Sequence, residues 1–536
     1  MNVTVYYRKG GEDLSTLATN NDLELVVTER GGSKTVRVKA WADVVLRRVT
    51  EENVATVDAR DTFLLNGYQS WTDTREFMLA ETENNIYRLP KFLVNAFAFD
   101  RYGDATFYPY SKNKLHGYDV FYSRGGNECF FCNMNAANAY LVFEVDRASG
   151  RVDLFSDYEN IPLRIGDELT VLSYRTAESY QAGMRLFCEL FPRRNPEKIF
   201  GYTSWYHYYQ NISEAQILRD LEAVDGRFNL FQIDDGYETF VGDWMSVDPK
   251  KFPNGLAPIV EKIHEKGLMA GIWLAPFVAE AKSEAYRRHP EWFRRGNDGK
   301  PVKCGSNWSG FYALDLDNEE VLSYIRSCLR RYTELGFDFF KLDFLYAANL
   351  PAYEGKTRAM SAEKAYAFLR ETLGDRLILG CGATPFNCAG KFDYLRVGPD
   401  VSLKFDDVWF MRMMHRERVS TKVTLQNTIY RSFMNGRLFG NDPDVFILRE
   451  KHVSLTEAQK EALLTINSLF GRVLMTSDFL ADYNEKSRAW LQDALERFRT
   501  AEVTGFERDG DRIRIHYTDA RGAQALVYDT EKGELV

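Results

Sequence analysis

Two charged side chains, Lys341 and Asp343, stand inside an otherwise apolar stretch, FFKLDFLYA (residues 339–347). Charged groups are rarely buried unless they are paired or take part in chemistry. Because alternate residues of a β-strand share one face, Lys341 and Asp343 lie on the same face. The opposite face is wholly apolar, as expected where helices pack, and consists of Phe340, Leu342 and Phe344. The segment is therefore predicted to be a two-faced strand that directs a cation and a carboxylate inward.

The same test finds polar or aromatic groups at the ends of three further strand candidates. Asp234 and Asp235 end NLFQIDDG, and Trp273 is on the inward face of AGIWLAP. In YLRVGPD, Arg396 is on the inward face and Asp400 follows at the rim. One buried carboxylate is most simply a structural ion pair, but four carboxylates and two cations at one rim favour an active site.

Two of these carboxylates suit glycoside hydrolysis. Asp343 ends the fourth barrel strand candidate and Asp400 follows the sixth, so their backbones lie roughly 10 Å apart. Side chains that lean inward would bring the carboxyl groups to about 5.5 Å, the separation of a retaining pair, whereas inverting pairs stand about 6.5 to 9.5 Å apart. We expect Lys341 to hold Asp343 ionised as a nucleophile. Asp400, less compensated, is expected to keep a raised pKa and to serve as acid and then base.

The elements that must position these groups fall into three regions. Residues 1–193 alternate apolar and polar residues between frequent turns, which predicts an antiparallel β-sandwich, enlarged because the region is long for a single sandwich. Residues 194–497 contain eight strand candidates, IFGYTSW, NLFQIDD, LMAGIWLAP, FDFFKLDF, RLILGCG, YLRVG, GRLFG and GRVLMT, most of them followed by helical patterns. Eight such units predict a catalytic (β/α)8 barrel, with a doubly wound sheet as the structural alternative. Residues 498–536 alternate again and predict a small antiparallel β domain.

Signals at the ends of the helices support the barrel. Ser213 with Gln216, and Thr456 with Gln459, have the spacing of a capping box. Other helical patterns stop at glycines that favour a C-terminal cap, namely Gly267, Gly336 and Gly374. The run NDPDV (441–445) is either a simple turn rich in Asn, Asp and Pro or a segment that shapes the barrel mouth.

Composition excludes several classes of protein. The net charge of −9 and the absence of a basic run argue against a nucleic-acid partner. Seven scattered Cys without CxxC pairs, and seven His without HExxH, argue against a structural or catalytic metal, and no cofactor is expected. The polar N-terminus is no signal peptide and no apolar run is long enough to span a membrane, so a cytoplasmic protein is expected. The sequence says nothing about oligomeric state.

Eight motifs, in order along the chain, resemble those of glycoside hydrolase family 36 α-galactosidases, the melibiase type in its shorter bacterial form. They are NGYQSW (66–71), SWYHYY (204–209), QIDDGY (232–237), GIWLAPF (271–277), FKLDFLYA (340–347), LGCGA (379–383), RVGPDV (396–401) and NDPDV (441–445). Each alone is weak, but their order on successive strands is specific. The resemblance implies a β-supersandwich, a central (β/α)8 barrel and a C-terminal β domain. It also implies a retaining exo-α-galactosidase that acts on terminal α-galactosides.

The resemblance also implies roles for individual residues. Asp343 resembles the catalytic nucleophile and Asp400 the acid/base. The residues that resemble substrate contacts are Asp234 and Asp235 for the 4- and 6-hydroxyls of galactose, Lys341 for a hydroxyl, Cys381, Gly382 and Arg396 on the 2-hydroxyl side, Trp273 as an apolar wall, and Tyr206 and Trp71 as aromatic contacts. Trp71 would reach over from the N-terminal domain, which would make that domain part of the site.

Two segments depart from the family pattern. GATPFN (382–387) stands where the family has a run closer to GAPL, and SLKFDD (402–407) replaces small and aromatic residues after Asp400. Both would border the 2-position or the aglycone side, so they affect the substrate more than the catalytic residues. The alternatives are an α-N-acetylgalactosaminidase, a galactosyl transferase of the raffinose-synthase type and a non-catalytic sugar-binding protein, the last disfavoured because it needs no nucleophile.

Overall fold

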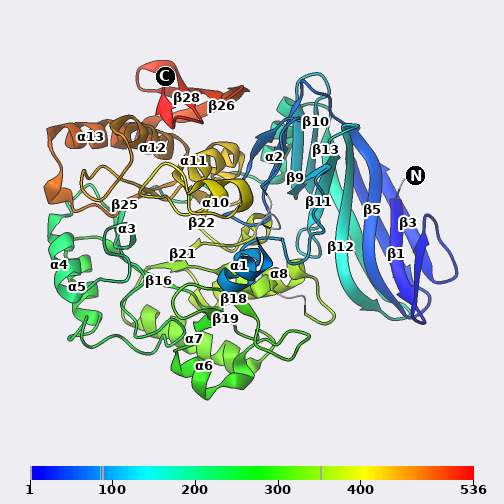
Figure 1. Cartoon of the computed structure of the whole chain (residues 1–536), viewed down its shortest axis with the longest axis horizontal. Helices are drawn as coiled ribbons and strands as arrows, with labels where there is room; N and C mark the ends of the chain where they lie inside the picture. The colour runs from blue at the N-terminus through cyan, green and yellow to red at the C-terminus, as the bar shows by residue number, and fades with distance from the viewer. Residues whose placement is uncertain (1–2, 85, 87–89, 351–352) are drawn as a thin grey trace.

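A computed structural model of the protein describes residues 3–84, 86, 90–350 and 353–536. Figure 1 shows an antiparallel β-region at the N-terminal end, a central region of parallel strands surrounded by helices, and a small C-terminal β-sheet above the barrel helices. The expected fold class, a supersandwich followed by a barrel and a small β domain, is confirmed.

The N-terminal region is built from two antiparallel sheets. One sheet has the order β2 (Glu12–Thr16), β1 (Val3–Lys9), β5 (Val44–Thr56), β12 (Arg151–Leu163), β11 (Leu141–Asp146) and β8 (Lys114–Tyr118). The other has the order β3 (Leu23–Arg30), β4 (Ser33–Ala40), β13 (Glu168–Ala177), β10 (Cys129–Asn133), β9 (Val120–Arg124), β6 (Thr62–Leu65) and β7 (Arg75–Phe77). Their apolar faces meet in one core, because alternate residues along each strand are buried.

The central region is a closed parallel barrel. Its strands run in the order β23 (Gly440–Asp442), β22 (Tyr394–Arg396), β21 (Leu377–Gly380), β20 (Phe339–Leu342), β16 (Met269–Leu274), β15 (Leu230–Ile233), β14 (Ile199–Thr203), β25 (Val473–Thr476) and β24 (Val445–Phe446). The two end strands are halves of one segment, residues 440–446, which pairs with β22 through its first half and with β25 through its second. This shared segment closes the sheet into eight strand positions.

The prediction for the seventh strand was wrong. GRLFG (436–440) contributes only Gly440 to the sheet, and the strand position is occupied by NDPDV and its neighbours instead. Pro443 lacks an N–H group and Asp444 has a positive φ of 71°, so the ladder is interrupted between β23 and β24. The segment that reads as a turn in the sequence therefore serves as a broken barrel strand.

Helices cover the outside of the barrel. The principal ones are α4 (Glu214–Ala223), α5 (Ala257–Glu265), α7 (Glu319–Glu334), α8 (Arg358–Leu373), α11 (Thr421–Tyr430), α12 (Glu457–Phe470) and α13 (Glu485–Thr500). Shorter helices are α3 (Trp205–Tyr208), α6 (Glu284–Arg288) and α9 (Pro385–Cys388), while α2 (Tyr180–Leu190) packs against β9, β10 and β13 of the N-terminal region. The capping box at Thr456 is confirmed. At Ser213 it is absent, because the hydroxyl donates to the Gln216 side chain, 2.8 Å away, rather than capping a backbone N–H.

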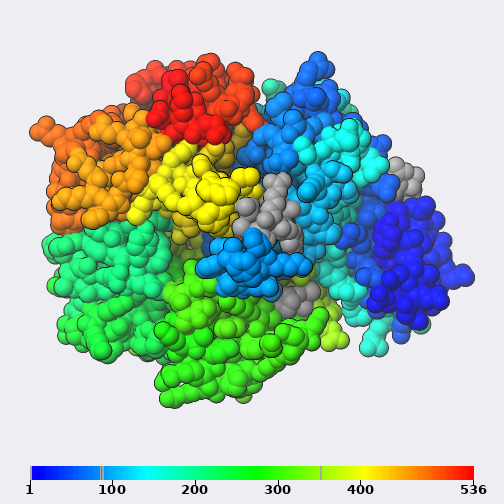
Figure 2. Space-filling model, viewed as in Figure 1, coloured from blue at the N-terminus to red at the C-terminus, as the bar shows by residue number. Residues whose placement is uncertain are grey.

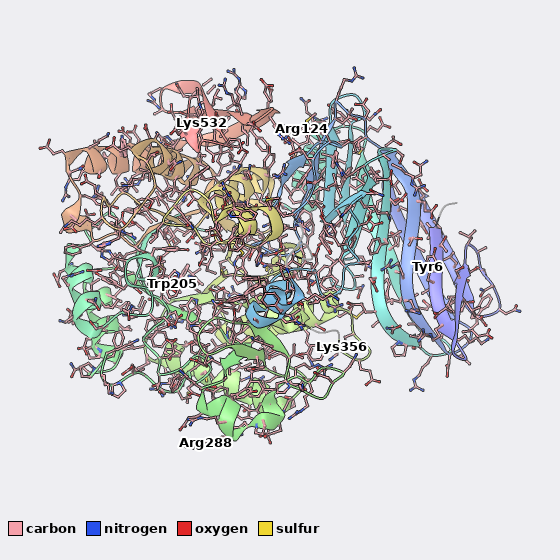
Figure 3. All side chains as sticks on the ribbon, viewed as in Figure 1. Tyr6, Arg124, Trp205, Arg288, Lys356 and Lys532 are labelled. Carbon is pink, nitrogen blue, oxygen red and sulfur yellow. The ribbon has the colours of Figure 1, made fainter. Side chains whose placement is uncertain are left out.

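The C-terminal sheet joins the other two regions. It contains β26 (Glu502–Asp509), β27 (Arg512–Asp519), β28 (Gly522–Asp529) and β29 (Glu534–Leu535), and it packs against α12. Arg124, labelled in Figure 3 at the top of the N-terminal sheets, donates to the Phe506 carbonyl at 2.7 Å. None of the helices over the described residues offers an apolar stretch long enough to cross a lipid bilayer.

One N-terminal segment reaches across to the barrel. It carries the helix α1 (Lys91–Phe97) and the 3₁₀ turn η2 (Phe99–Arg101), which lie in front of the barrel in Figure 1. The Ser306 hydroxyl donates to the Phe97 carbonyl at 2.8 Å, and the Tyr102 hydroxyl donates to Asn307 at 2.8 Å. Figure 2 shows this segment, in blue, beside the yellow and green segments of the barrel loops.

A buried charge cluster ties this segment to the barrel loops. The His116 ring lies between Glu83 and Asp104, with nitrogen to oxygen distances of 2.8 and 2.7 Å. Arg416, from the loop after β22, places a guanidinium nitrogen 3.7 Å from Asp104. Burial disfavours a charged imidazole, but the attraction of Glu83 and Asp104 outweighs it and raises the pKa of His116 to about 9.

This cluster predicts a pH-dependent contribution to stability. A raised folded-state pKa means that His116 stabilises the fold fully below its unfolded pKa of about 6.5 and loses that contribution as the pH rises to about 9. The shift corresponds to about 3 kcal/mol. We expect His116→Gln to lower the thermal unfolding midpoint most at pH 6 and much less at pH 9. An equal difference from wild type at both pH values would contradict the assignment.

Candidate active site

A cavity of about 270 Å³ opens at the carboxyl ends of the barrel strands. Its walls are formed by Trp71, Phe99, Tyr102, Trp205, Asp234, Asp235, Trp273, Ser306, Asn307, Trp308, Lys341, Asp343, Phe344, Pro399, Asp400, Asp407, Met411, His415, Glu417, Arg418 and Val419. Seven of the eleven residues predicted for the site are among them: Trp71, Asp234, Asp235, Trp273, Lys341, Asp343 and Asp400. The cavity is therefore the candidate active site, since active sites of this architecture lie at this end of the barrel.

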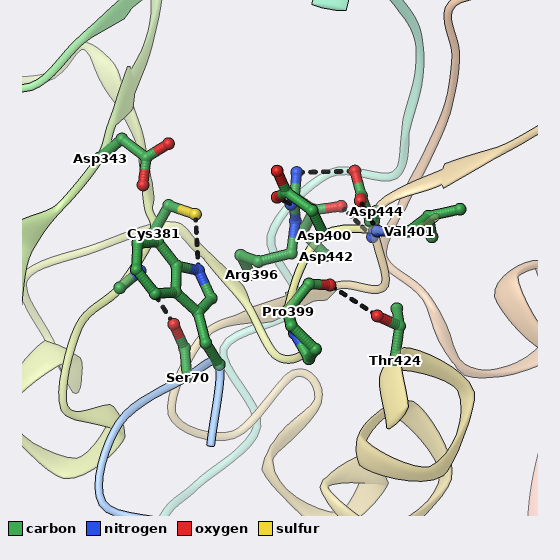
Figure 4. Close-up of polar contacts among 12 residues, drawn as sticks. Ser70, Asp343, Cys381, Arg396, Pro399, Asp400, Val401, Thr424, Asp442 and Asp444 are labelled. Carbon is green, nitrogen blue, oxygen red and sulfur yellow. Dashed lines mark hydrogen bonds and ion pairs between the residues drawn. The ribbon is translucent and has the colours of Figure 1, made fainter. Parts of the chain in front are cut away.

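Four predicted residues lie behind the cavity wall rather than in it. They are Tyr206, Cys381, Gly382 and Arg396, all buried. The Trp71 indole N–H donates to the Cys381 sulfur at 3.2 Å, and the Gly382 N–H donates to the Ser70 hydroxyl at 2.9 Å. Figure 4 shows these contacts beside Asp343. The N-terminal region thus docks directly on the turn after β21 and places Trp71 in the cavity.

Asp343 is fixed at the end of β20 by three hydrogen bonds. Its backbone N–H donates to the Leu274 carbonyl at 2.8 Å, which extends the pairing with β16 by one residue. One carboxylate oxygen accepts from the Trp273 indole N–H at 3.0 Å, and the other accepts from the Phe344 N–H at 2.8 Å. Asp343 as a whole is 8% exposed, and it lines the cavity.

Lys341 has a different partner from the one expected. Its ammonium nitrogen donates to Asp234 Oδ2 at 2.9 Å, rather than to Asp343. Burial disfavours the charged ammonium, but the attraction of Asp234, with a smaller part from Asp343, raises the pKa of Lys341. Gln232 also donates to Asp234, at 2.7 Å. Lys341, on β20, and Asp234, after β15, therefore form a buried ion pair across the end of the intervening strand β16.

Phe344 corrects the expected outward face of this strand. The prediction placed it against the helices with Phe340 and Leu342, but β20 ends at Leu342 and Phe344 has a positive φ of 54°. The backbone turn directs the ring into the cavity, where it packs 5.4 Å from Trp71 and 5.2 Å from Trp308 between ring centres. Alternation along a strand ceases to apply where its hydrogen-bonded ladder stops.

Asp400 belongs to a charge network centred on Arg396. The guanidinium contacts Asp400 at 3.0 Å, Asp442 at 2.9 Å and Asp444 at 2.8 Å through three different nitrogens (Figure 4). The Asp400 side chain is 35% exposed, and this exposed part faces the cavity deep within the protein. Burial raises the pKa of Asp400, against the opposing effect of Arg396, and the Asp343 carboxylate adds to the rise. The two carboxyl groups of the predicted pair therefore face one cavity in different environments.

The NDPDV segment supplies the acids beneath Asp400. Asp444 accepts hydrogen bonds from the Tyr206 hydroxyl and, at 2.7 Å, from the Val401 N–H. Burial, opposed by Arg396 and reinforced by Asp400, raises the pKa of Asp444 to about 7. The segment is therefore a barrel strand rather than a simple turn. Behind the cavity wall, Tyr206 donates a hydrogen bond to Asp444, and Arg396 pairs with both Asp442 and Asp444.

The environment of Asp235 was not foreseen from the sequence. Its carboxylate accepts from the Trp308 indole N–H at 2.9 Å and from the Gln210 amide at 3.0 Å. Burial, followed by repulsion from Asp235, raises the pKa of Glu238 well above its usual range, and burial also raises the pKa of Asp235. Trp308 comes from the hairpin of β18 (Lys303–Gly305) and β19 (Phe311–Ala313), in a loop without any periodic signal.

Other missed residues come from the rim. Trp205, labelled in Figure 3, begins α3, while Phe99 and Tyr102 come from the N-terminal segment. The loop after β22 contributes Asp407, Met411, His415, Glu417, Arg418 and Val419. Two segments depart from the family pattern. The segment 402–407 reaches the cavity through Asp407, whereas the segment 382–387 is buried and lies outside the cavity wall. Among the described residues, no group of three or more His, Cys, Asp or Glu side chains is arranged to hold a metal ion.

Comparison with known proteins agrees with this architecture. The family model described as Melibiase matches residues 194–374. Among curated proteins, an A type blood α-D-galactosamine galactosaminidase of Flavonifractor plautii is 33% identical over 144 residues, which are 25% of this chain and 13% of the relative. Alpha-galactosidase 1 of Pediococcus pentosaceus is 31% identical over 140 residues, 25% of this chain and 18% of the relative. The matches thus span less than a fifth of either relative.

Solved structures match over nearly the whole chain. An α-galactosidase of Thermus thermophilus, in complex with p-nitrophenyl α-D-galactopyranoside, is 26% identical with a TM-score of 0.71, covering 96% of this chain and 98% of that one. The GH36 α-galactosidase AgaA of Geobacillus stearothermophilus is 13% identical with a TM-score of 0.63, covering 98% and 80%, and shows likeness of fold alone. The Melibiase family model therefore matches residues 194–374, and the overall fold of the chain is similar to that of these α-galactosidase structures.

Proposed function

We propose that the protein is a retaining exo-α-galactosidase that hydrolyses terminal, non-reducing α-galactosides. The observation that carries the proposal is the pair Asp343 and Asp400, which line one cavity in different environments. Asp343 accepts hydrogen bonds from the Trp273 indole and the Phe344 N–H, and Asp400 has a raised pKa. One carboxylate suited to attack and one carboxylic acid suited to proton donation are what a double displacement requires.

In the proposed mechanism the two residues act in turn. Asp343 attacks the anomeric carbon and forms a covalent galactosyl ester, while Asp400 gives its proton to the departing glycosidic oxygen. In the second step Asp400 takes a proton from water, whose oxygen attacks the anomeric carbon and releases Asp343. Two inversions leave the anomeric configuration unchanged.

The remaining polar groups of the cavity suit the galactose ring. Asp234 and Asp235 are proposed to accept hydrogen bonds from the 4- and 6-hydroxyls, and Lys341 to donate to one of them. Both carboxylates are already fixed, Asp234 by Lys341 and Asp235 by Trp308, so they are pre-organised for neighbouring hydroxyls. Relatives named as α-galactosidases support galactose as the sugar.

The test compares two sugars that differ only at the 2-position. Trp71 packs closely on the turn after β21, since a Cβ on Gly382 would lie 3.0 Å from its ring, and the family resemblance puts this turn on the 2-hydroxyl side. We expect kcat/KM on p-nitrophenyl α-galactoside to exceed that on its 2-acetamido analogue by at least about 100-fold. A preference for the analogue would instead identify an α-N-acetylgalactosaminidase, and galactosyl transfer dominating at low acceptor concentration would identify a transferase.

A second test concerns the acid beneath Asp400. Above a pH of about 7, where Asp444 is ionised, Asp444→Asn removes a negative charge beside Arg396, which leaves the guanidinium to stabilise ionised Asp400 more strongly. We expect the basic limb of the kcat/KM profile to move about one unit to lower pH. Asp444→Glu keeps the charge and is the control. A limb that stays in place in Asp444→Asn would show that Asp444 does not tune Asp400.

A further inference from the structure

Exposed large hydrophobic side chains are concentrated around the cavity mouth. Of the 16 large hydrophobic side chains that are exposed in the described part of the chain, seven lie in two short segments, residues 92–97 and 408–419. Phe92 is 70% and Phe97 46% exposed in α1. The second segment, which includes α10 (Trp409–Met414), exposes Val408, Trp409, Phe410, Met413 and Val419. We call these seven side chains the mouth patch.

The two halves of the mouth patch meet at the cavity. The Phe97 ring stacks on Phe99 with 5.3 Å between centres, and Phe99 packs 5.2 Å from the His415 ring at the end of α10. Phe99, Met411 and Val419 line the cavity itself. Phe97, Phe99 and His415 thus connect α1 to the end of α10 beside the cavity, where the blue and yellow segments adjoin in Figure 2. A concentration of exposed apolar groups at one place signals a binding surface.

The polar groups at the same rim are already engaged within the protein. Arg418 pairs with Asp406 at 3.0 Å, and Glu417 accepts from the Thr72 hydroxyl at 2.8 Å. Asn307 accepts from Tyr102, and Ser306 donates to a backbone carbonyl, both at 2.8 Å. A second sugar ring would need hydrogen-bond partners for its hydroxyls, which such a rim supplies poorly. An apolar group has no hydrogen bonds to satisfy, so it can lie at this rim without that cost.

We propose that the mouth patch binds the aglycone, and that the site is built for α-galactosides with an alkyl-chain aglycone rather than a further sugar. This inference rests on the proposed galactosidase activity. In that mechanism the leaving group lies beside Asp400, and the loop that carries Asp400 also carries α10. A second protein copy is the less suitable occupant. Seated on both α1 and α10, it would lie across the mouth and obstruct the substrate.

The experiment measures kcat/KM for methyl, hexyl and octyl α-galactosides below their critical micelle concentrations, with melibiose as the sugar aglycone. Simple alkanols are similar leaving groups, so differences along the series report binding of the chain. Full burial of one methylene is worth roughly a fourfold gain. Allowing for partial burial, we expect octyl to exceed methyl α-galactoside by at least about 30-fold, and to exceed melibiose as well.

Matched variants locate the effect. Trp409→Ser should remove most of the gain with chain length while leaving the methyl galactoside unchanged. Trp41→Ser alters another exposed tryptophan, 46% exposed in the N-terminal region and outside the cavity wall, and should change neither. The mass of wild type and Trp409→Ser in solution is measured by light scattering alongside.

Each result has one meaning. No hydrolysis of any galactoside would refute the proposed function itself. Hydrolysis without a dependence on chain length, or with a dependence that Trp409→Ser preserves, would overturn the aglycone inference and leave the activity standing. A wild-type dimer that becomes a monomer in Trp409→Ser, with no chain-length effect, would identify the mouth patch as a contact between copies and also overturn the inference.

Discussion

Asp343→Asn is expected to lower kcat/KM on every α-galactoside by at least about 10⁴-fold, because an amide cannot form the galactosyl ester. The fold should be retained. The amide oxygen can still accept from the Trp273 indole or from the Phe344 N–H, and the side chain is the same size. Circular dichroism and the thermal midpoint, measured with activity, separate loss of chemistry from loss of structure.

The smaller variant Asp343→Ala gives a sharper test of the same role. It leaves space for azide beneath the anomeric carbon, and with p-nitrophenyl α-galactoside the attack by azide occurs once, with inversion. The expected product is therefore β-galactosyl azide, identified by the coupling of its anomeric proton in NMR. Near-normal activity in either variant, or an α-configured azide from Asp343→Ala, would remove Asp343 as the nucleophile.

Asp400→Asn is expected to act through the leaving group. On melibiose, whose leaving group needs a proton, kcat/KM should fall by about 10² to 10⁴-fold. On p-nitrophenyl α-galactoside, whose leaving group departs without a proton, kcat/KM should fall far less. Hydrolysis of the ester intermediate then becomes slow, since no base activates water, so kcat drops on both substrates. The basic limb of the pH profile, which reflects the raised pKa of Asp400, should disappear.

Azide again distinguishes this role, with the opposite stereochemistry. In Asp400→Asn azide needs no base and attacks the galactosyl ester on Asp343, so kcat on the nitrophenyl substrate recovers and the product is α-galactosyl azide. Asp407→Asn is the matched control, because Asp407 lines the same cavity without a proposed part in the chemistry. Equal loss on both substrates without azide rescue would contradict the acid/base assignment.

Much of the candidate site was predictable because alternate residues of a β-strand share one face, which shows which polar side chains point into the barrel. Alternation correctly placed Trp273 within β16, Lys341 within β20 and Asp234, directly after β15, toward the inside. The alternation of strand and helix likewise predicted the barrel, since the periods of 2 and 3.6 residues are set by backbone geometry alone. Where the ladder stops, as at Phe344, or where Pro443 interrupts it, the same reasoning failed.

The sequence by itself determined the three-part architecture and the set of inward-facing carboxylates, because both follow from short-range hydrogen bonding and burial. Only the tertiary structure decided which charges pair and which loops complete the cavity. Lys341 lies 107 residues from its partner Asp234, and Trp71 lies 310 residues from Cys381. Contacts at such separations depend on how whole elements pack, and loops such as 97–102 and 403–419 carry no period that reports their neighbours.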